Sequence, residues 1–210
     1  MNTKKLNNYA NKVRIRTEKE LLVRRSEFLK ICNILDSLNI NYFLQTGILL
    51  GAIRNNGFIP WDWDVEISVY SEEVIGKISH LVTKINNSDF EVEKYNKEFS
   101  NLKIDFIGKL PKETTHYTIL GWCHDKKKKI FWRNKFKVPE HLFSKMQKIK
   151  LFNKYHNAPF PPEDYLKYQY GDWKKPLRSH NKSQYLTKEF YNFSPFKNLM
   201  MKIINVIFLK

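Results

Sequence analysis

Residues 62–67 of this chain, DWDVEI, alternate acids with apolar residues and so have the period of a β-strand. On a strand, the side chains of Asp62, Asp64 and Glu66 would share one face. Three adjacent carboxylates repel one another unless a cation lies among them. Mg²⁺ prefers such hard oxygen ligands and completes its shell with water and substrate phosphates. We therefore expect a metal site for Mg²⁺, with Mn²⁺ as an alternative. The other interpretation is a solvated edge strand whose charges discourage aggregation.

The segment before the acids has the composition of a phosphate-binding turn and helix. Residues 41–44 read as a short buried strand, which we expect Gly47 to end with a tight turn. Residues 49–54 then read as a short helix containing Gly51, whose first backbone N–H groups could hold phosphate oxygens. Arg54 would add a planar fork for the same phosphates. Its alternative role is that of a loop arginine paired with a nearby acid.

Residues 47–67, GILLGAIRNNGFIPWDWDVEI, resemble the signature of the LicD family of phosphocholine transferases and the related fukutin-type ribitol-phosphate transferases. That signature runs roughly GTLLGxxR and then GFIPWDxDx followed by Asp or Glu. The chain departs from it at Ile48, where the family usually has Thr, and at Trp63, often another acid. The missing hydroxyl at Ile48 removes one phosphate contact, for which Thr46 is a candidate substitute.

Two further stretches extend the resemblance, which covers roughly residues 20–178. Residues 102–108, LKIDFIG, resemble the second acidic strand of the family, and Asp105 is our candidate for the last metal ligand; a surface aspartate is the alternative. Residues 158–173, APFPPEDYLKYQYGDW, resemble its closing segment. From these motifs we take as substrate-binding candidates Trp61, Tyr170, Asp172 and Trp173. Aromatic faces stack on a base or a sugar, although such clusters also anchor terminal segments.

The resemblance implies a nucleotidyltransferase superfamily member with the DNA polymerase beta fold. It also implies Mg²⁺-dependent transfer of phosphocholine or a polyol phosphate from a CDP-activated donor. The acceptor would be a sugar hydroxyl of a cell-surface polysaccharide, such as lipopolysaccharide or capsule, or of its lipid-linked precursor. The acids on residues 62–66 and Asp105 would bind metal and act in catalysis, one of them accepting the proton of the acceptor hydroxyl.

Two other functions remain open. One is a nucleotidyltransferase of the same superfamily that transfers a nucleoside monophosphate to RNA, protein or a small molecule. The other is a non-catalytic module that binds nucleic acid or membrane. The first would show salt-sensitive RNA binding, and metal-dependent turnover of a donor would exclude the second.

The net charge of +16 is unevenly distributed. Residues 1–30 carry +6, residues 31–124 carry −4 and residues 125–210 carry +14. The basic flanks would attract polyanions such as a nucleotide donor or an anionic membrane surface, whereas nucleic acid is not the expected partner. Cys32 and Cys123 form no zinc or disulfide pattern, and the N-terminus lacks the apolar core of a secretory signal. We expect a cytoplasmic protein, peripheral at the inner face of the plasma membrane.

The expected fold class is α+β, with a small mixed sheet flanked by helices and a C-terminal helical extension. Residues 1–16 would be a basic arm, 17–195 the catalytic domain, and 196–210 an amphipathic helix that docks on the core or lies on a membrane. Thr17 and Glu20 predict a capping box that opens a helix over about residues 18–38. A second helix would run from a Ser71 cap to about residue 85. Strands are expected at 90–95, 102–107, 116–121 and 129–132, and a short helix and loop over 160–178.

Overall fold

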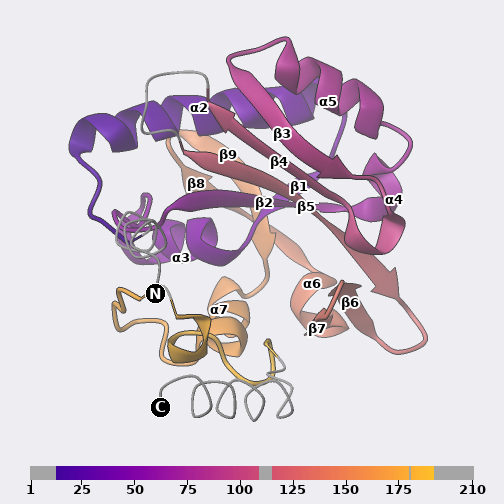
Figure 1. The fold of residues 1–210 in the computed structure, drawn as a ribbon. Coiled ribbons are helices and arrows are strands. Elements are labelled where there is room, and N and C mark those ends of the chain that lie inside the picture. The colour runs from indigo at the N-terminus through magenta and orange to yellow at the C-terminus, as the bar shows by residue number, and fades with distance from the viewer. Residues whose placement is uncertain (1–12, 109–114, 180, 192–210) are drawn as a thin grey trace, which may run out of the picture.

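The computed structural model describes residues 13–108, 115–179 and 181–191. A mixed, twisted sheet lies between helices on both of its faces (Figure 1). The strands are β1 Tyr42–Leu44, β2 Asp64–Tyr70, β3 Phe90–Asn96, β4 Lys103–Gly108, β5 His116–Asp125, β6 Ile130–Arg133, β7 Phe136–Pro139, β8 Met146–Leu151 and β9 Lys154–Pro159. The helices are α2 Glu18–Ser37, α3 Thr46–Asn55, α4 Ser71–Val74, α5 Ile78–Asn86, α6 Glu140–Phe143 and α7 Pro162–Tyr170, with short 3₁₀ turns η1 Phe99–Asn101 and η2 Lys182–Gln184.

The sheet is mixed, as expected, but it is larger than the small sheet that the sequence suggested. Its nine strands follow the order β3-β4-β5-β2-β1-β9-β8, with β6 and β7 continuing from the far half of β5. The pairs β2–β5 and β1–β9 are parallel, and the other pairs are antiparallel. The acidic strand β2 therefore lies in the interior of the sheet, which excludes the edge-strand interpretation of its charges.

One face of the sheet packs against α2 and α5 (Figure 1). The Thr17 capping box that opens α2 is confirmed, because the Thr17 side chain accepts from the Glu20 backbone and the Glu20 carboxylate from the Thr17 backbone. Fully buried strand residues on this face include Ile67 and Tyr117. The Tyr117 hydroxyl donates to Glu27 of α2 at 2.7 Å, which fixes the helix over β5.

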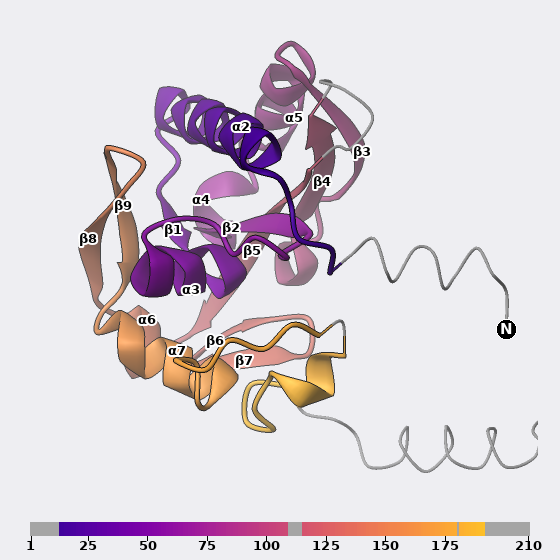
Figure 2. The ribbon, with the colours of Figure 1, turned by 90° about the vertical axis from the view of Figure 1, so that its left-hand side faces the viewer.

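The opposite face is covered by α3, α6, α7 and the chain that follows them (Figure 2). Trp122 of β5 meets Phe143 of α6 edge to face at 5.3 Å between ring centroids. Phe143 in turn packs on Tyr165 of α7. Successive side chains of a strand thus point alternately to the face under α2 and α5 and to the face under α3, α6 and α7.

Two expectations about local structure were wrong. The helix expected over 71–85 is broken between Val74 and Ile78, and the residue before α4 is Tyr70, so Ser71 is its first residue and not its cap. The β8–β9 hairpin was not foreseen. Its two-residue turn, Phe152-Asn153, has both φ angles positive (53° and 62°), as a type I′ turn requires, yet lacks the usual glycine.

The expected C-terminal helix and most of the N-terminal arm lie outside the described residues, so the domain boundaries stay predictions. Within the described part of the chain, no helix has both the length and the apolar character needed to span a bilayer.

Candidate functional site

The acidic segment straddles the start of β2. Asp64 and Glu66 occupy alternate strand positions, separated by buried Val65, as the sequence predicted. Asp62 does not belong to the strand; its backbone N–H closes a turn to the Ile59 carbonyl at 3.0 Å. Only two of the three acids therefore share the strand face by periodicity, and Asp62 is brought beside them by the turn.

Asp105 is aligned with this acid row across the sheet. In the parallel β2–β5 pair Glu66 lies opposite Thr118, and in the antiparallel β4–β5 pair Asp105 lies opposite the same Thr118. Residues paired directly across strands point to one face, so all three share a face. Thr118 donates a hydrogen bond to Asp105 Oδ1 at 2.9 Å, which orients that carboxylate.

Asp105 also has basic neighbours on its own side of the sheet. Lys103 lies 2.8 Å from its Oδ1, and Lys94 of β3 lies 3.8 Å from its Oδ2. Its charge is therefore compensated without a metal, which the sequence argument had not anticipated. Asp105 as the last metal ligand stays a prediction.

Burial and mutual repulsion raise the pKa of the carboxyl groups at the start of the row. Burial raises the pKa of Asp62 to about 6; Arg24 opposes this rise and Glu66 adds to it. The pKa of Asp64 is raised well above its ordinary value by burial and by its neighbours Glu66 and Asp62, with Lys182 acting in the opposite direction. Burial is the largest cause of both shifts, and a bound cation would favour the ionised form of both carboxyl groups.

Arg24 holds the acidic segment in place, and sequence reasoning missed it. This fully buried arginine of α2 donates to the Asp62 carbonyl at 2.7 Å, to the Trp63 carbonyl at 3.4 Å and to Thr115 Oγ1 at 3.2 Å. The available signal was its position on the apolar stripe of α2, between Leu21 and Phe28. A buried charge on such a stripe needs a partner elsewhere in the fold.

Helix α3 begins earlier than expected, at Thr46, so Gly47 lies in its first turn and does not form a tight turn before it. Gly47 serves close packing: a Cβ there would collide with the Asp62 carboxylate. Thr46 has φ +54°, a strained value for a β-branched residue. Ile48, where the family signature has Thr, is buried in the core. The first turn of α3 thus lies against the Asp62 side chain.

A buried network fixes the start of α3. Gln45, the residue before the helix, is fully buried and donates from Nε2 to the Tyr165 hydroxyl at 2.5 Å. Its Oε1 accepts from Trp122 Nε1 at 2.9 Å and from Ser68 Oγ. Strands β2 and β5 and helix α7 are therefore joined at the helix terminus that faces the acids.

The far end of α3 also contributes to the site. A Cβ on Gly51 would collide with the Gly57 carbonyl, so this glycine lets the return loop cross the helix closely. Arg54 donates to Asn55 Oδ1 at 3.0 Å and stacks on Trp61 at 5.9 Å. It pairs with no acid of the site, contrary to the alternative role considered for it.

The closing segment carries the three candidate residues Tyr170, Asp172 and Trp173. Tyr170, at the end of α7, has a pKa raised by burial and by charges that include Asp62 and Glu66. Tyr185, which sequence reasoning missed, also has a pKa raised by burial and by these acids. The centroid of its ring lies 6.3 Å from that of Tyr170. Asp172 is exposed and pairs with Lys175 at 2.9 Å. Trp173 packs against the core and beneath Lys174. Substrate binding by Asp172 and Trp173 stays a prediction.

Within the described ranges, no three His, Cys, Asp or Glu side chains converge on one metal position. Mg²⁺, however, is commonly held by one or two carboxylates plus substrate phosphates and water. The chemistry of the donor set fits such a site, because Asp64 and Glu66 offer carboxylate oxygens on one strand face and Asp62 lies beside them.

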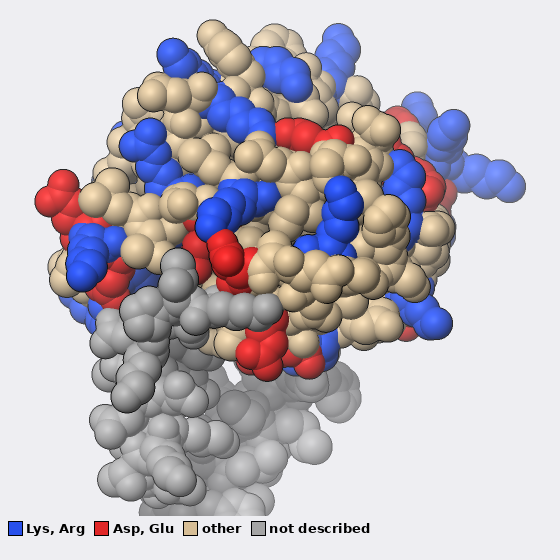
Figure 3. All heavy atoms as spheres, turned by 90° about the horizontal axis from the view of Figure 1, so that it is seen from above, with Lys and Arg blue, Asp and Glu red and all other residues tan. Residues whose placement is uncertain are grey.

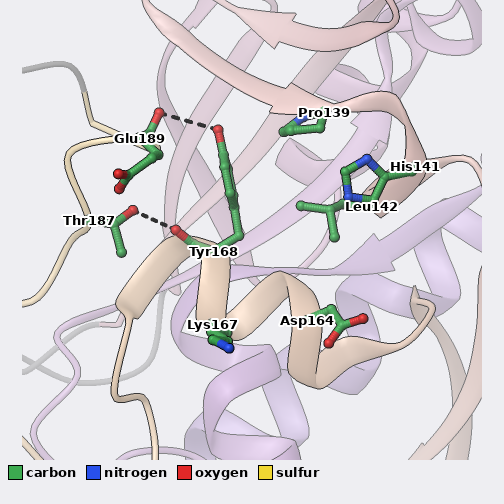
Figure 4. A pocket seen from close by; sticks show the side chains of 8 residues that line it. All are labelled: Pro139, His141, Leu142, Asp164, Lys167, Tyr168, Thr187 and Glu189. Carbon is green, nitrogen blue, oxygen red and sulfur yellow. Dashed lines mark hydrogen bonds between the residues drawn. The ribbon is translucent and has the colours of Figure 1, made fainter.

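A separate hollow of about 400 Å³ lies between α7 and the β7–α6 corner (Figure 4). Tyr168 stands on one side, bonded through its hydroxyl to the Glu189 carbonyl at 3.2 Å, and Leu142 and His141 stand on the other. None of the acids at the start of β2 lines it.

Basic side chains form no single patch on the face above α2 and α5, where Lys and Arg are scattered among acidic and uncharged residues (Figure 3).

The chain is similar to a known family and to several known proteins. Residues 39–161, more than half of the chain, match the family described as "LicD/FKTN/FKRP, nucleotidyltransferase domain". The chain is 41% identical over 44 residues to "Ribitol 5-phosphate transferase FKRP" of Homo sapiens, covering 21% of this chain and 9% of that protein. It is 41% identical over 59 residues to "Lipopolysaccharide cholinephosphotransferase LicD" of Haemophilus influenzae, covering 25% of this chain and 22% of that protein. It is 27% identical over 150 residues to "Uncharacterized protein RP689" of Rickettsia prowazekii, covering 68% of this chain and 52% of that protein. The chain thus spans about half the length of the Rickettsia protein and less of the other two.

Proposed function

Since the chain belongs to the LicD/FKTN/FKRP family, we propose that it transfers a phospho-alcohol group from an activated donor to a sugar hydroxyl. The observation that carries the proposal is the juxtaposition of Asp62, Asp64 and Glu66 with the first turn of α3, where Gly47 leaves room for the Asp62 carboxylate. Cation-binding oxygens next to phosphate-binding N–H groups suit phosphoryl transfer. The named transferases among the relatives support the reaction class.

The donor is a CDP-activated alcohol, either CDP-choline or a CDP-polyol, and the acceptor is a surface glycan or its lipid-linked precursor. Asp64 and Glu66, with Asp62 and Asp105 nearby, would hold Mg²⁺. When bound, the ion would neutralise charge on the phosphates of the donor. The α3 N–H groups bind phosphate oxygens, with Arg54 at the far end of the helix. Tyr170 stacks on the base or the sugar.

In the reaction, the acceptor oxygen forms a bond to the phosphorus while the bond from phosphorus to the CMP oxygen breaks. The acceptor proton passes to a carboxylate. Asp62, which lies outside the strand and beside Asp64 and Glu66, is our candidate for this role. We propose in addition that the fold is of the polymerase beta type and that the enzyme works in the cytoplasm, at the inner membrane surface.

The test is CMP release from CDP-choline, CDP-ribitol and CDP-glycerol, with Mg²⁺ and crude surface glycan. The expected result is glycan-dependent CMP from one donor, abolished by EDTA and restored by Mg²⁺ or Mn²⁺. If no donor yields CMP and CTP or ATP instead releases pyrophosphate, the proposal fails and a nucleotidyltransferase replaces it.

A further inference from the structure

Arg133, at the end of β6, is a buried arginine that no sequence motif had marked. Its side chain is 9% exposed, and its buried Nε has no hydrogen-bond partner among the described residues. No carboxylate in that part of the chain lies within ion-pair distance of it. Its close contact is the ring of Phe136, 5.9 Å from the guanidinium carbon. A buried N–H without an acceptor is costly, so the Arg133 Nε–H suits a partner that the described residues do not supply.

The charges that act on Arg133 are those of the acid row. Burial lowers its pKa, and the carboxylates of Glu66 and then Asp105 oppose that effect. Both acids belong to the face shared across β2, β5 and β4. The guanidinium is thus close enough to sense these acids but not paired with either of them.

The backbone that carries Arg133 is fixed. The β6–β7 hairpin pairs Arg133 with Phe136, and the next residue, Asn134, donates its N–H to the Ser100 carbonyl at 3.0 Å. Phe136 packs on Phe190 with 5.5 Å between centroids. The backbone of Arg133 is therefore positioned before any ligand arrives, which lowers the entropy lost on binding.

We propose that Arg133 is a phosphate-binding residue, whose guanidinium contacts anionic phosphate oxygens bound beside Glu66 and Asp105. A planar guanidinium fork suits phosphate, and a bound phosphate would give the Nε–H the acceptor that it lacks among the described residues. This inference rests on the proposed function in that it assumes a phosphate-bearing substrate. The phosphate belongs either to the diphosphate of the donor or to the acceptor.

The test compares Arg133→Met and Arg133→Lys with Arg25→Met. Arg25 is a matched control because it also stacks on a phenylalanine, Phe152, at 5.2 Å and its replacement removes the same charge. Thermal unfolding is followed with Mg²⁺ and CDP, with inorganic pyrophosphate, and with glycerol phosphate added to the CDP complex. The wild type and Arg25→Met should respond equally. Arg133→Met should bind the phosphate probe roughly 10- to 100-fold more weakly, and Arg133→Lys should recover only part of the affinity.

The Tm measured without ligand tells whether Arg133 acts in binding or in holding the fold together. Because Arg133→Met removes a buried N–H that lacks an acceptor among the described residues, its ligand-free Tm should equal or exceed that of the wild type. Loss of the CDP response assigns Arg133 to the donor, and loss of the glycerol phosphate response alone assigns it to the acceptor. Loss of the pyrophosphate response in a protein that turns over no CDP-alcohol would sustain this inference while the proposed function fails. A lowered ligand-free Tm with unchanged probe affinity, or a wild type that responds to no phosphate probe, would overturn it.

Discussion

The two faces of the central sheet are built from the same strands, yet their side chains are satisfied in different ways. Under α2 and α5, residues such as Ile67 and Tyr117 are fully buried, and the Tyr117 hydroxyl is bonded. On the other face, Asp64 has a raised pKa and Arg133 lacks a hydrogen-bond partner at its buried Nε among the described residues. The side chains of Ile67 and Tyr117 are satisfied in the free protein, whereas we propose that Asp64 and Arg133 are satisfied by ligands. Alternation along β2 thus places stability on one side and the proposed chemistry on the other.

The largest expected effect is on activity. Asp64→Asn should lower kcat/KM for phospho-alcohol transfer by on the order of 10³-fold, because it removes a group that would hold the charge-neutralising ion. Its Tm should stay equal or rise, since a repelling buried charge is lost. The matched control is Asp164→Asn in the hollow of Figure 4, which should leave turnover unchanged. An equal loss of kcat/KM in Asp64→Asn and Asp164→Asn would contradict the assignment of the chemistry to the acid face.

The next effect is on stability. Ile67→Ala, on the face under α2, should destabilise the protein by about 2–5 kcal/mol, because it leaves a cavity in a fully buried position. The kcat/KM of the folded fraction should change little. Urea unfolding measures the difference, with the 57%-exposed Leu22→Ala as the control that should stay near wild type. An Ile67→Ala protein of normal stability but without activity would show that the faces do not divide these roles.

A smaller effect tests the contact between α3 and the acids. Gly47→Ala places a Cβ against the Asp62 carboxylate, which should cost about 1–3 kcal/mol and weaken donor binding by displacing that acid. Gly76→Ala meets no atom within 4 Å and should be neutral or slightly stabilising. Thermal unfolding and the KM for donor measure both. If Gly76→Ala lost as much activity as Gly47→Ala, the contact between α3 and Asp62 would have no specific role in donor binding.

The smallest effect is on pH dependence. A carboxyl whose folded pKa is raised binds its proton more tightly in the folded state, so stability falls as pH rises from the ordinary value of 3.8 through about 6 for Asp62. His156, whose pKa burial lowers to about 4, acts in the opposite direction over an overlapping range. The difference between wild type and Asp62→Asn isolates the carboxylate: the wild type should gain about 2 kcal/mol relative to the variant between pH 7 and pH 4. Parallel pH–stability curves would contradict the raised pKa.

The sequence predicted those features that depend on local periodicity and chain order. The strand carrying Asp64 and Glu66, the capping box at Thr17 and the two strands expected at 90–95 and 102–107 were all confirmed. The β8–β9 hairpin escaped prediction because its turn reaches positive φ with Phe152 and Asn153, residues that do not identify such a turn from composition.

The buried arginines could not be predicted with their partners. Arg24 meets residues 38 and 91 positions away along the chain, and only the assembled fold brings them together. The alignment of Asp105 with Glu66 likewise depends on the register of β5 between β2 and β4. A motif marks which residues carry chemistry, but pairing across strands decides which of them share a face.

The most direct test of the functional contrast between the two faces is a crystal structure of the protein with CDP and Mn²⁺, read by anomalous scattering. The account predicts a manganese peak on the acid face, within about 2.3 Å of oxygens of Asp64 or Glu66, with the diphosphate against the first turn of α3. A manganese peak or a CDP molecule in the hollow beside Tyr168, with the acid face empty, would contradict it.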